Sequence, residues 1–449
     1  MQNQKTLSLY QFFILSFFLF SMFLGAGNII FAPPLGQAAG SNTWLAMSGF
    51  LITGVGLVLL AIMALSIAGG SIDTLASRVG SRFAKFYCLL LFLALGPLYV
   101  IPRTAAVVFE VSVTPFLGDG VNSLALFLFS SLFIASTIYL SLEPKKFVSR
   151  IGRILTPTLL VLLAIIVVKS LVTPIGEFGE PTGDYIDHAF GKGFTQGYYT
   201  MDVLAAFVFG KIFIDACRNS GVSSQNMASV FVKAGIFSVL ALAVVQLSLA
   251  GMGASSVSEI GISRNGGEAL PKIVYLLLGD VGVMILACVV FLTGWTTAIA
   301  CLASVSEYFS RLLPTYSYRA WVWIFGIISL VITNFGLSSI LSMASPILYF
   351  LYPISITLIA LVFLNPYFKG NRAVYIGAVA AASVMGFLDG LKDIDALPVG
   401  LQTFLLNYLP FYQSGMGWIL VALMGGIMAW LIQRIYPFAS QRFDNSPIQ

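Results

Sequence analysis

Charge is the property that this chain has least of. Asp, Glu, Lys and Arg make up 9% of its 449 residues, whereas 58% are hydrophobic, and the mean hydropathy is +0.95. Because a soluble domain carries about 25% charged residues, this composition excludes an ordinary water-facing surface. We therefore expect a membrane protein whose outer surface meets lipid.

Residues for metal and redox chemistry are also scarce. The single histidine, His188, lies in a polar loop, and Cys88, Cys217, Cys288 and Cys301 stand in apolar runs without CxxC spacing. One histidine cannot make a metal site, and isolated cysteines in apolar runs are usually small hydrophobic side chains packed between helices. Without a nucleophile–base set or a phosphate-binding loop, the sequence argues against an enzyme and predicts no cofactor.

Long apolar runs fill the chain instead. A spanning helix needs about 20 mainly apolar residues, and the qualifying segments are 11–38, 43–68, 83–112, 122–141, 152–173, 195–217, 227–252, 281–310, 318–335, 338–364, 372–391 and 414–436. A stretch at 266–279 is too short to span and predicts a separate interfacial helix. The first run is longer than the apolar core of a signal peptide, so we expect it to be retained. The sequence thus predicts an all-α membrane protein with about 12 transmembrane helices, forming one transmembrane transport domain over 1–449.

The loop charges orient these spans. Alternate loops, counted from the N-terminus, collect most of the 23 basic residues, including Arg78, Arg82, Lys85, Lys145, Lys146, Arg150, Arg153, Arg311, Arg319, Lys369, Arg372, Arg434 and Arg442. The opposite loops are rich in acids. By the positive-inside rule, both termini are predicted to be cytoplasmic, in a multi-pass protein of the cell (inner) membrane.

The sequence predicts that the first membrane helix is interrupted at Gly25-Ala26-Gly27-Asn28, with Pro33-Pro34 following. Irregular backbone inside a membrane is tolerated where it lines a cavity, and glycine leaves the helical conformation easily. Freed carbonyls can then bind a cation, while the second half-helix turns its positive N-terminus toward an anionic group. Close packing of small residues is the alternative. Packing does not explain the amide of Asn28 in mid-membrane, which favours a functional break.

Four motifs resemble a known family. They are GAGNIIFAPP (25–34), GPLYVIPRTAAVVFEV (96–111), YYTMDVLAAFVFG (198–210) and SPILYFLYP (345–353). With them the chain resembles the branched-chain amino acid:cation symporters of the BrnQ type. The resemblance implies the LeuT-like fold, with inverted five-helix repeats at 11–173 and 195–364 and two additional helices at 372–436.

The resemblance also implies a function. We expect import of leucine, isoleucine and valine with Na⁺ or H⁺ as coupling ion, by alternating access. The expected partners are this substrate and the lipid bilayer, with no nucleic acid and no obligatory protein partner. A symporter of another small neutral amino acid is the alternative. A channel is a weaker one, because the rings of repeated polar residues that channels favour are not seen.

More distantly, the chain resembles the sodium-coupled amino acid carriers of the same fold, which share a G-x-G-N break in the first helix. Their pattern, carried over to this sequence and called the family pattern below, assigns residues of the first break. It places Gly25, Ala26 and Gly27 beside the amino and carboxylate groups of the substrate, the Asn28 side chain and Phe23 carbonyl at one cation site, and the Ser21 and Leu24 carbonyls at a second.

A matching break is expected in the sixth span, near Tyr198–Asp202. The resemblance assigns the Thr200 hydroxyl to the cation, and Tyr199 and Asp202 to the substrate pocket. Leu204 and Ala206 stand where the family pattern has glycines, so the break point stays open. An acid inside the membrane is costly, by about 2.5–3.5 kcal/mol. Asp202 is therefore expected to serve an ammonium group or a cation, or else to cap the half-helix.

Three threonines of the eighth span, Thr293, Thr296 and Thr297, complete the assigned cation ligands. Hydroxyls are hard donors suited to Na⁺, although threonines in membrane helices also bond back to the preceding turn. Asp202, in contrast, would suit a coupled proton, so the coupling ion stays open.

Two charged residues of the third span, Arg103 and Glu110, are expected to brace or gate the bundle. They are seven residues apart, hence on one face but two turns distant, and too far for a direct pair within a straight helix. A buried arginine needs a partner, and we expect Asp202 or, through a bend, Glu110.

Overall fold

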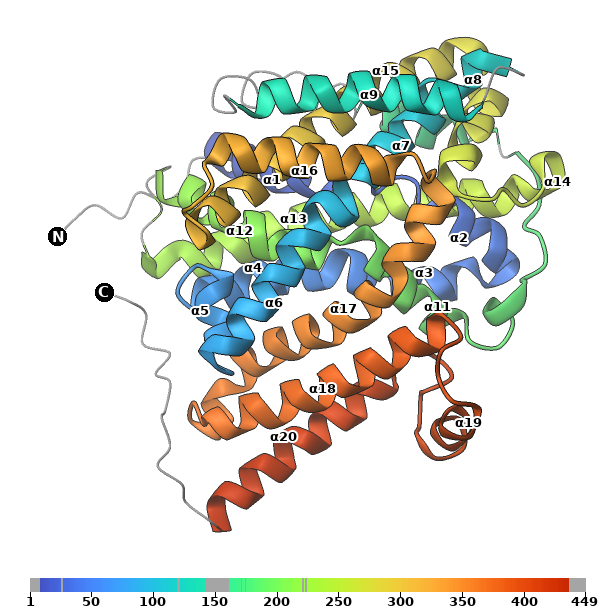
Figure 1. The fold of residues 1–449 in the computed structure, drawn as a ribbon. Coiled ribbons are helices and arrows are strands. Elements are labelled where there is room, and N and C mark those ends of the chain that lie inside the picture. Colours follow the sequence, from blue (N-terminus) through green and yellow to red (C-terminus); the bar gives the residue numbers. More distant parts are fainter. Residues whose placement is uncertain are drawn as a thin grey trace.

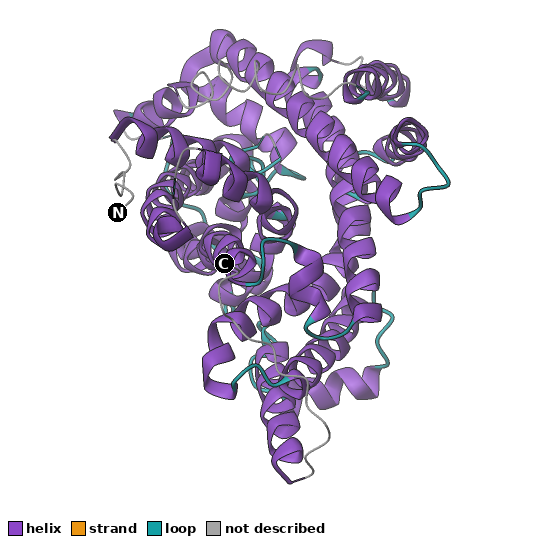
Figure 2. Ribbon diagram, turned by 90° about the vertical axis from the view of Figure 1, so that its left-hand side faces the viewer, coloured by secondary structure: helices purple, strands orange, loops and turns teal. Residues whose placement is uncertain are grey.

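The computed structural model describes residues 9–25, 27–118, 122–142, 161–170, 172–173, 175–219, 222 and 224–435. Within these ranges the chain forms helices and connecting loops, and no β-strand (Figure 2). The long apolar runs thus satisfy their backbone polar groups within helices, as a lipid environment requires.

Each predicted span has a helical counterpart in the described residues. In chain order these are α1 (Leu9–Phe23) with α2 (Ala32–Ala39), α3 (Thr43–Leu51) with α4 (Leu57–Ile67), α6 (Ser81–Leu93) with α7 (Val100–Ser112), α9 (Ser123–Ser141), the helix Val161–Ser170, α11 (Ala189–Gln196) with α12 (Asp202–Asn219), α13 (Ser224–Ser255), the later part of α15 (Gly266–Leu312), α16 (Tyr318–Thr333), α17 (Leu337–Phe368), α18 (Arg372–Asp393) and α20 (Gly417–Ile435). Eight helices in the described part of the chain are long and apolar enough to cross a membrane. The all-α, multi-pass prediction is confirmed.

Shorter elements connect the spans. They are α5 (Ile72–Ser77), α8 (Thr114–Leu117), α14 (Val257–Ile260) and α19 (Val399–Tyr408), the 3₁₀ turns Gly40–Asn42, Gly183–Tyr185 and Gly197–Thr200, and the π-helical segments Ile52–Gly56 and Ala94–Leu98. The π segments lie inside the second and third spans, where such local widening replaces the regular hydrogen-bond ladder.

The expected short helix at 266–279 is present and packs against the bundle. Gly279, with φ 63° and ψ −160°, interrupts α15 and separates this short helix from the eighth span. A Cβ at Gly266 would overlap the carbonyl oxygen of Ile30, so the short helix touches the backbone beyond the first break. The tenth span contains Pro346 and Pro353 and still forms one continuous helix, α17, which Figure 1 shows bent.

The half-helices α2 and α11 are held by close backbone packing. A Cβ at Gly253 of α13 would overlap the carbonyl oxygen of Pro33 in α2, and one at Gly193 of α11 would overlap that of Ala46 in α3. Because glycine has no side chain, these helices can approach until their backbones are in contact. Both broken spans are thereby fixed in the interior, while α18 and α20 pack beside α17 at one edge of the molecule (Figure 1).

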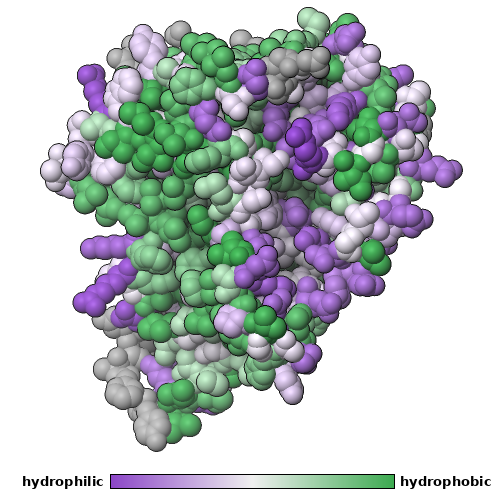
Figure 3. Space-filling model, turned by 45° about the vertical axis from the view of Figure 1, so that its right-hand side comes forward, coloured by the Kyte–Doolittle hydropathy of each residue, from purple (hydrophilic) through white to green (hydrophobic). Residues whose placement is uncertain are grey.

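The surface fits a lipid surrounding. Large apolar side chains stand outward, with Leu132 75% and Val281 67% exposed, and the face in Figure 3 carries broad hydrophobic areas, with hydrophilic residues gathered toward its right-hand part. Cys88, Cys217 and Cys301 are buried between helices as expected. For Cys288 that expectation is wrong, because its side chain is exposed among the outward-facing residues of α15.

Candidate substrate and cation site

The first break runs from the end of α1 at Phe23 to the start of α2 at Ala32. The Nδ2 of Asn28 donates to the carbonyl oxygen of Phe23, so the Asn28 side chain satisfies a carbonyl that the end of α1 leaves open. The main-chain amide of Asn28 donates to Gly25 over 3.0 Å. The structure thus brings the Asn28 side chain and the Phe23 carbonyl together, and their role at a cation site stays a prediction.

The sixth span breaks at Met201. Gly197–Thr200 forms a 3₁₀ turn, Met201 has left-handed backbone angles (φ 61°, ψ 15°), and α12 starts at Asp202. The Thr200 hydroxyl donates to the carbonyl of Gly197 over 2.9 Å and accepts from the amide of Asp202 at 3.3 Å. Thr200 thus stabilises the break locally, and a carboxylate stands at the positive N-terminal end of α12.

The two breaks meet through their polar side chains. The Nδ2 of Asn28 donates to Oδ2 of Asp202 over 2.6 Å, and the two residues are 4% and 6% exposed. Asp202 is therefore placed where both roles weighed for it are open, since it begins α12 and also contacts the first break. A buried carboxylate beside open backbone carbonyls can attract a cation or an ammonium group.

Arg103 of α7 reaches the same region. Its Nη1 donates to the main-chain carbonyl of Tyr199 over 2.5 Å and to the hydroxyl of Tyr99 over 3.3 Å. Its guanidinium carbon lies 4.7 Å from the ring centre of Tyr99 and 5.4 Å from that of Phe31. Among the described residues Arg103 makes no direct ion pair with a carboxylate, and the Tyr199 carbonyl accepts from it instead. Asp202 nevertheless lies near enough for its charge to interact with that of Arg103.

The eighth span supplies one residue that faces the first break. A Cβ at Gly25 would lie 3.6 Å from Oγ1 of Thr297, in ordinary contact. The hydroxyls of Thr296 and Thr297 both donate to the carbonyl of Thr293 over 2.9 Å, and that of Thr293 donates to Val289 over 2.7 Å. Each of these hydroxyls therefore makes the bond to the preceding turn that was weighed as the alternative, while its oxygen keeps acceptor capacity.

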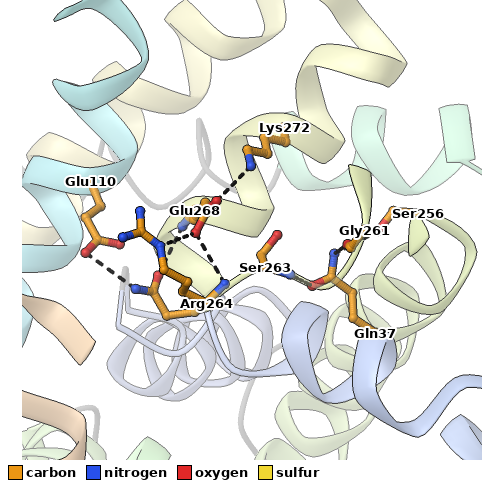
Figure 4. A network of polar contacts seen from close by, with 9 residues as sticks. Gln37, Glu110, Ser256, Gly261, Ser263, Arg264, Glu268 and Lys272 are labelled. Atoms are coloured by element: carbon orange, nitrogen blue, oxygen red, sulfur yellow. Dashed lines mark hydrogen bonds and ion pairs between the residues drawn. The ribbon is translucent and has the colours of Figure 1, made fainter. Parts of the chain in front are cut away.

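Glu110 lies away from the two breaks, at the far end of α7. Its Oε1 accepts from Nδ2 of Asn265 at 3.5 Å, and the same Nδ2 donates to Ser338 over 3.0 Å. Figure 4 shows Glu110 facing the start of α15, where Arg264 and Lys272 both contact Glu268. Glu110 thus joins α7, α15 and α17 at one end of the bundle and does not pair with Arg103.

The same end is tied to α2 through Gln37. Its Nε2 donates to the Ser256 hydroxyl over 3.1 Å and to the Gly261 carbonyl over 3.2 Å, and its Oε1 accepts from the Ser263 amide at 3.0 Å (Figure 4). Together with the Glu110 contacts, these bonds hold the segment 256–278 over the half-helix that follows the first break.

Gln246 of α13 was missed by the sequence reasoning. It is 2% exposed, and its Nε2 donates to the main-chain carbonyl of Asn28 over 3.5 Å. Its Oε1 has no hydrogen-bond partner among the described residues. An amide in the middle of an apolar run was the signal that identified Asn28, and the same signal was available here.

Two assigned residues are not fully described. Ala26 lies outside the described residues, and for Ser21 the structure gives its place in the last turn of α1 but not its side chain. Leu24 is buried, directly after the end of α1. Among the described residues no group of three or more His, Cys, Asp or Glu side chains is arranged to hold a metal ion. The oxygens of Asn28, Asp202, Gln246 and Thr297 instead offer hard ligands of the kind that bind Na⁺.

The architecture is that of the LeuT-like secondary carriers. Mhp1, a nucleobase-cation-symport-1 family transporter solved in a closed conformation with bromovinylhydantoin bound, matches with a TM-score of 0.59 and 16% identity, covering 95% of this chain and 93% of that one. MhsT, solved in complex with L-phenylalanine, matches with a TM-score of 0.55 and 19% identity, covering 94% and 98%. At these identities the likeness establishes the fold.

The sequence places the chain within one family. Residues 8–436 match the family described as branched-chain amino acid transport protein. The chain is 39% identical over 420 residues to the branched-chain amino acid permease BraB of Bacillus subtilis, covering 93% of this chain and 94% of that one. It is 35% identical over 424 residues to the permease BrnQ of Escherichia coli strain K12, covering 94% and 95%. The chain belongs to this family of transporters and is not an enzyme.

Proposed function

We propose that this protein is a symporter that imports leucine, isoleucine and valine through the cell (inner) membrane, coupled to Na⁺ or H⁺. The observation that carries the proposal is the meeting of two helix breaks at Asn28 and Asp202, in a chain of the branched-chain amino acid transport family. Broken helices present backbone dipoles that hold a zwitterion without a large charged pocket. The relatives BraB and BrnQ are named as branched-chain amino acid permeases, and we propose that this carrier likewise needs no obligatory protein partner.

The substrate side chain is proposed to lie among aromatic rings beside the breaks. The rings of Phe31 and Tyr199 are 6.2 Å apart, and Tyr198 stacks on Tyr352 at 4.3 Å. Such apolar surroundings discriminate by only about 10–200-fold per methylene. Leucine, isoleucine and valine are therefore expected to compete for one site.

The coupling cation is proposed to lie beside Asn28 and Asp202. The unpartnered Oε1 of Gln246 and the Thr297 hydroxyl that faces Gly25 add neutral oxygen donors. Neutral oxygens and one carboxylate favour Na⁺. The second candidate is a proton carried by Asp202 itself, which its burial next to Asn28 supports.

Alternating access is proposed to open the site to each side in turn. The bonds of Gln37 and Glu110 to the segment 256–278 join elements at one end of the bundle, and we propose that they separate when the site opens to that side. We assign this end, which carries α14 and α19, to the outside. The end that carries α5 and the basic residues Arg78 and Arg82 is assigned to the cytoplasm, together with both termini.

Counterflow into proteoliposomes tests the function. Vesicles containing the purified protein are loaded with unlabelled valine and diluted into labelled leucine. A transient accumulation of label, abolished by external isoleucine, is expected. If valine-loaded and empty vesicles take up leucine equally, or if exchange occurs with other small neutral amino acids but not with valine, the branched-chain assignment is wrong.

A further inference from the structure

Arg103 is a buried cation that the fold leaves incompletely paired. It is 4% exposed, and none of the ion pairs among the described residues includes it. Its Nη1 bonds to a backbone carbonyl and a tyrosine hydroxyl, while its Nε has no hydrogen-bond partner in the part of the chain that the structure describes. Moving a positive charge out of water is expensive unless an anion or several hydrogen bonds replace the water. Arg103 therefore has both charge and a donor to offer to an anion.

The guanidinium lies where the first and sixth spans are broken. A Cβ at Gly27 would be 2.8 Å from Nη2 and 3.2 Å from Nε of Arg103, so the side chain rests on the backbone of the first break. The same guanidinium also contacts the sixth break, because it donates to the Tyr199 carbonyl. The guanidinium lies over the rings of Tyr99 and Phe31, which restrict its orientation. A ligand that enters between the breaks thus meets this guanidinium.

We propose that Arg103 binds the α-carboxylate of the transported amino acid. The planar fork of an arginine matches a carboxylate with two parallel hydrogen bonds, and Nε and Nη2 form the side of that fork that faces Gly27. Asp202, bonded to Asn28 across the breaks, then remains for the ammonium group or the cation. This inference rests on the proposed function, because it takes an amino acid to be the ligand.

A purely structural role makes a different prediction. As a brace, Arg103 would fix the Tyr199 carbonyl whatever ligand is bound, and its loss would weaken every ligand alike. As a carboxylate anchor, Arg103 selects for the carboxylate, and its loss penalises ligands that carry one. Leucine and leucinamide separate these roles, since they share the side chain and the amine but differ at the carboxylate.

The test measures binding of leucine and leucinamide to the purified full-length protein by ligand-induced thermal stabilisation. The unmodified protein is expected to prefer leucine by about 30-fold or more, as for a buried hydrogen-bonded charge pair. In Arg103→Gln this preference should fall to about 3-fold or less, chiefly through lost leucine affinity. Arg103→Lys keeps the charge without the fork and should retain an intermediate preference.

Arg78→Gln is the matched control. Arg78 is also buried, donates to the Tyr375 hydroxyl over 2.8 Å and lies over that ring at 5.7 Å, but it belongs to the other end of the bundle. Its replacement should leave the preference for leucine unchanged. If Arg103→Gln weakens leucine and leucinamide in proportion, or abolishes both, Arg103 is a brace and the inference fails. If the unmodified protein binds no branched-chain amino acid, the proposed function itself fails.

Discussion

Asn28 and Asp202, 174 positions apart in sequence, are joined by a hydrogen bond of 2.6 Å from Nδ2 to Oδ2. One residue belongs to the break in the first span and the other begins the half-helix after the break in the sixth. Asn28 also donates to the Phe23 carbonyl, so a single amide links the end of α1 to the start of α12. A change in the charge or ligation of Asp202 is therefore transmitted directly to the first break.

Replacing Asn28 tests its place at the cation site. Asn28→Ala removes both bonds of the amide and leaves the Asp202 carboxylate without this donor. Loss of one partner of a buried polar group costs about 1–3 kcal/mol. We expect the cation concentration that half-saturates leucine uptake to rise by about 10-fold. Asn334→Ala serves as control, because Asn334, directly after the end of α16, also donates from a half-buried amide, to Ser130 and Leu330. An unchanged cation requirement in Asn28→Ala would remove Asn28 from the site.

Close backbone packing predicts that alanine substitutions at two neighbouring glycines of α13 lower the stability of the protein by different amounts. A Cβ at Gly253 would overlap the carbonyl oxygen of Pro33, whereas one at Gly251 would meet the ring of Trp44 at 3.3 Å, and that ring is exposed and free to shift. Gly253→Ala is expected to cost about 1–3 kcal/mol of stability and to lower the melting temperature in detergent clearly. Gly251→Ala should change it little. Equal melting temperatures for the two variants would show that α2 and α13 do not pack as described.

The assignment of sides to the membrane can be tested by labelling. In a background without the four native cysteines, Asp395→Cys, in the loop before α19, should react with an impermeant maleimide in intact cells. Arg82→Cys, at the start of α6, should react only after permeabilisation. Both side chains are exposed, so access to the reagent depends on the side of the membrane. The reverse pattern would invert the proposed topology.

Much of the fold follows from the sequence, because lipid leaves the backbone few options. Apolar runs of about 20 residues located the spans, and Gly25–Asn28 located the first break before any coordinates were known. The repeat boundaries at 11–173 and 195–364 stay a prediction. The sixth break was placed within Tyr198–Asp202 without a glycine to mark it. Its left-handed residue is Met201, a residue type that gives no such signal.

The partners of the polar residues were harder to predict. Arg103 was expected to find Asp202 or Glu110, yet it donates to the Tyr199 carbonyl. Backbone acceptors at a break have no signature in sequence, so a search for opposite charges misses them. Gln246 was overlooked for a different reason, since nothing in the family pattern marked that position. Its buried, unpartnered oxygen becomes visible only when α13 is packed against the first break.

The central claim is that the joined breaks couple amino acid movement to a cation. Leucine uptake into proteoliposomes is measured with an inward Na⁺ gradient, with an inward proton gradient, and with neither, at equal membrane potential. Concentrative uptake is expected under one of the two gradients, the Na⁺ gradient being favoured, and this response should be lost in Asp202→Asn. Leucine uptake that reaches the same level without either gradient, or that stays gradient-driven in Asp202→Asn, would contradict it.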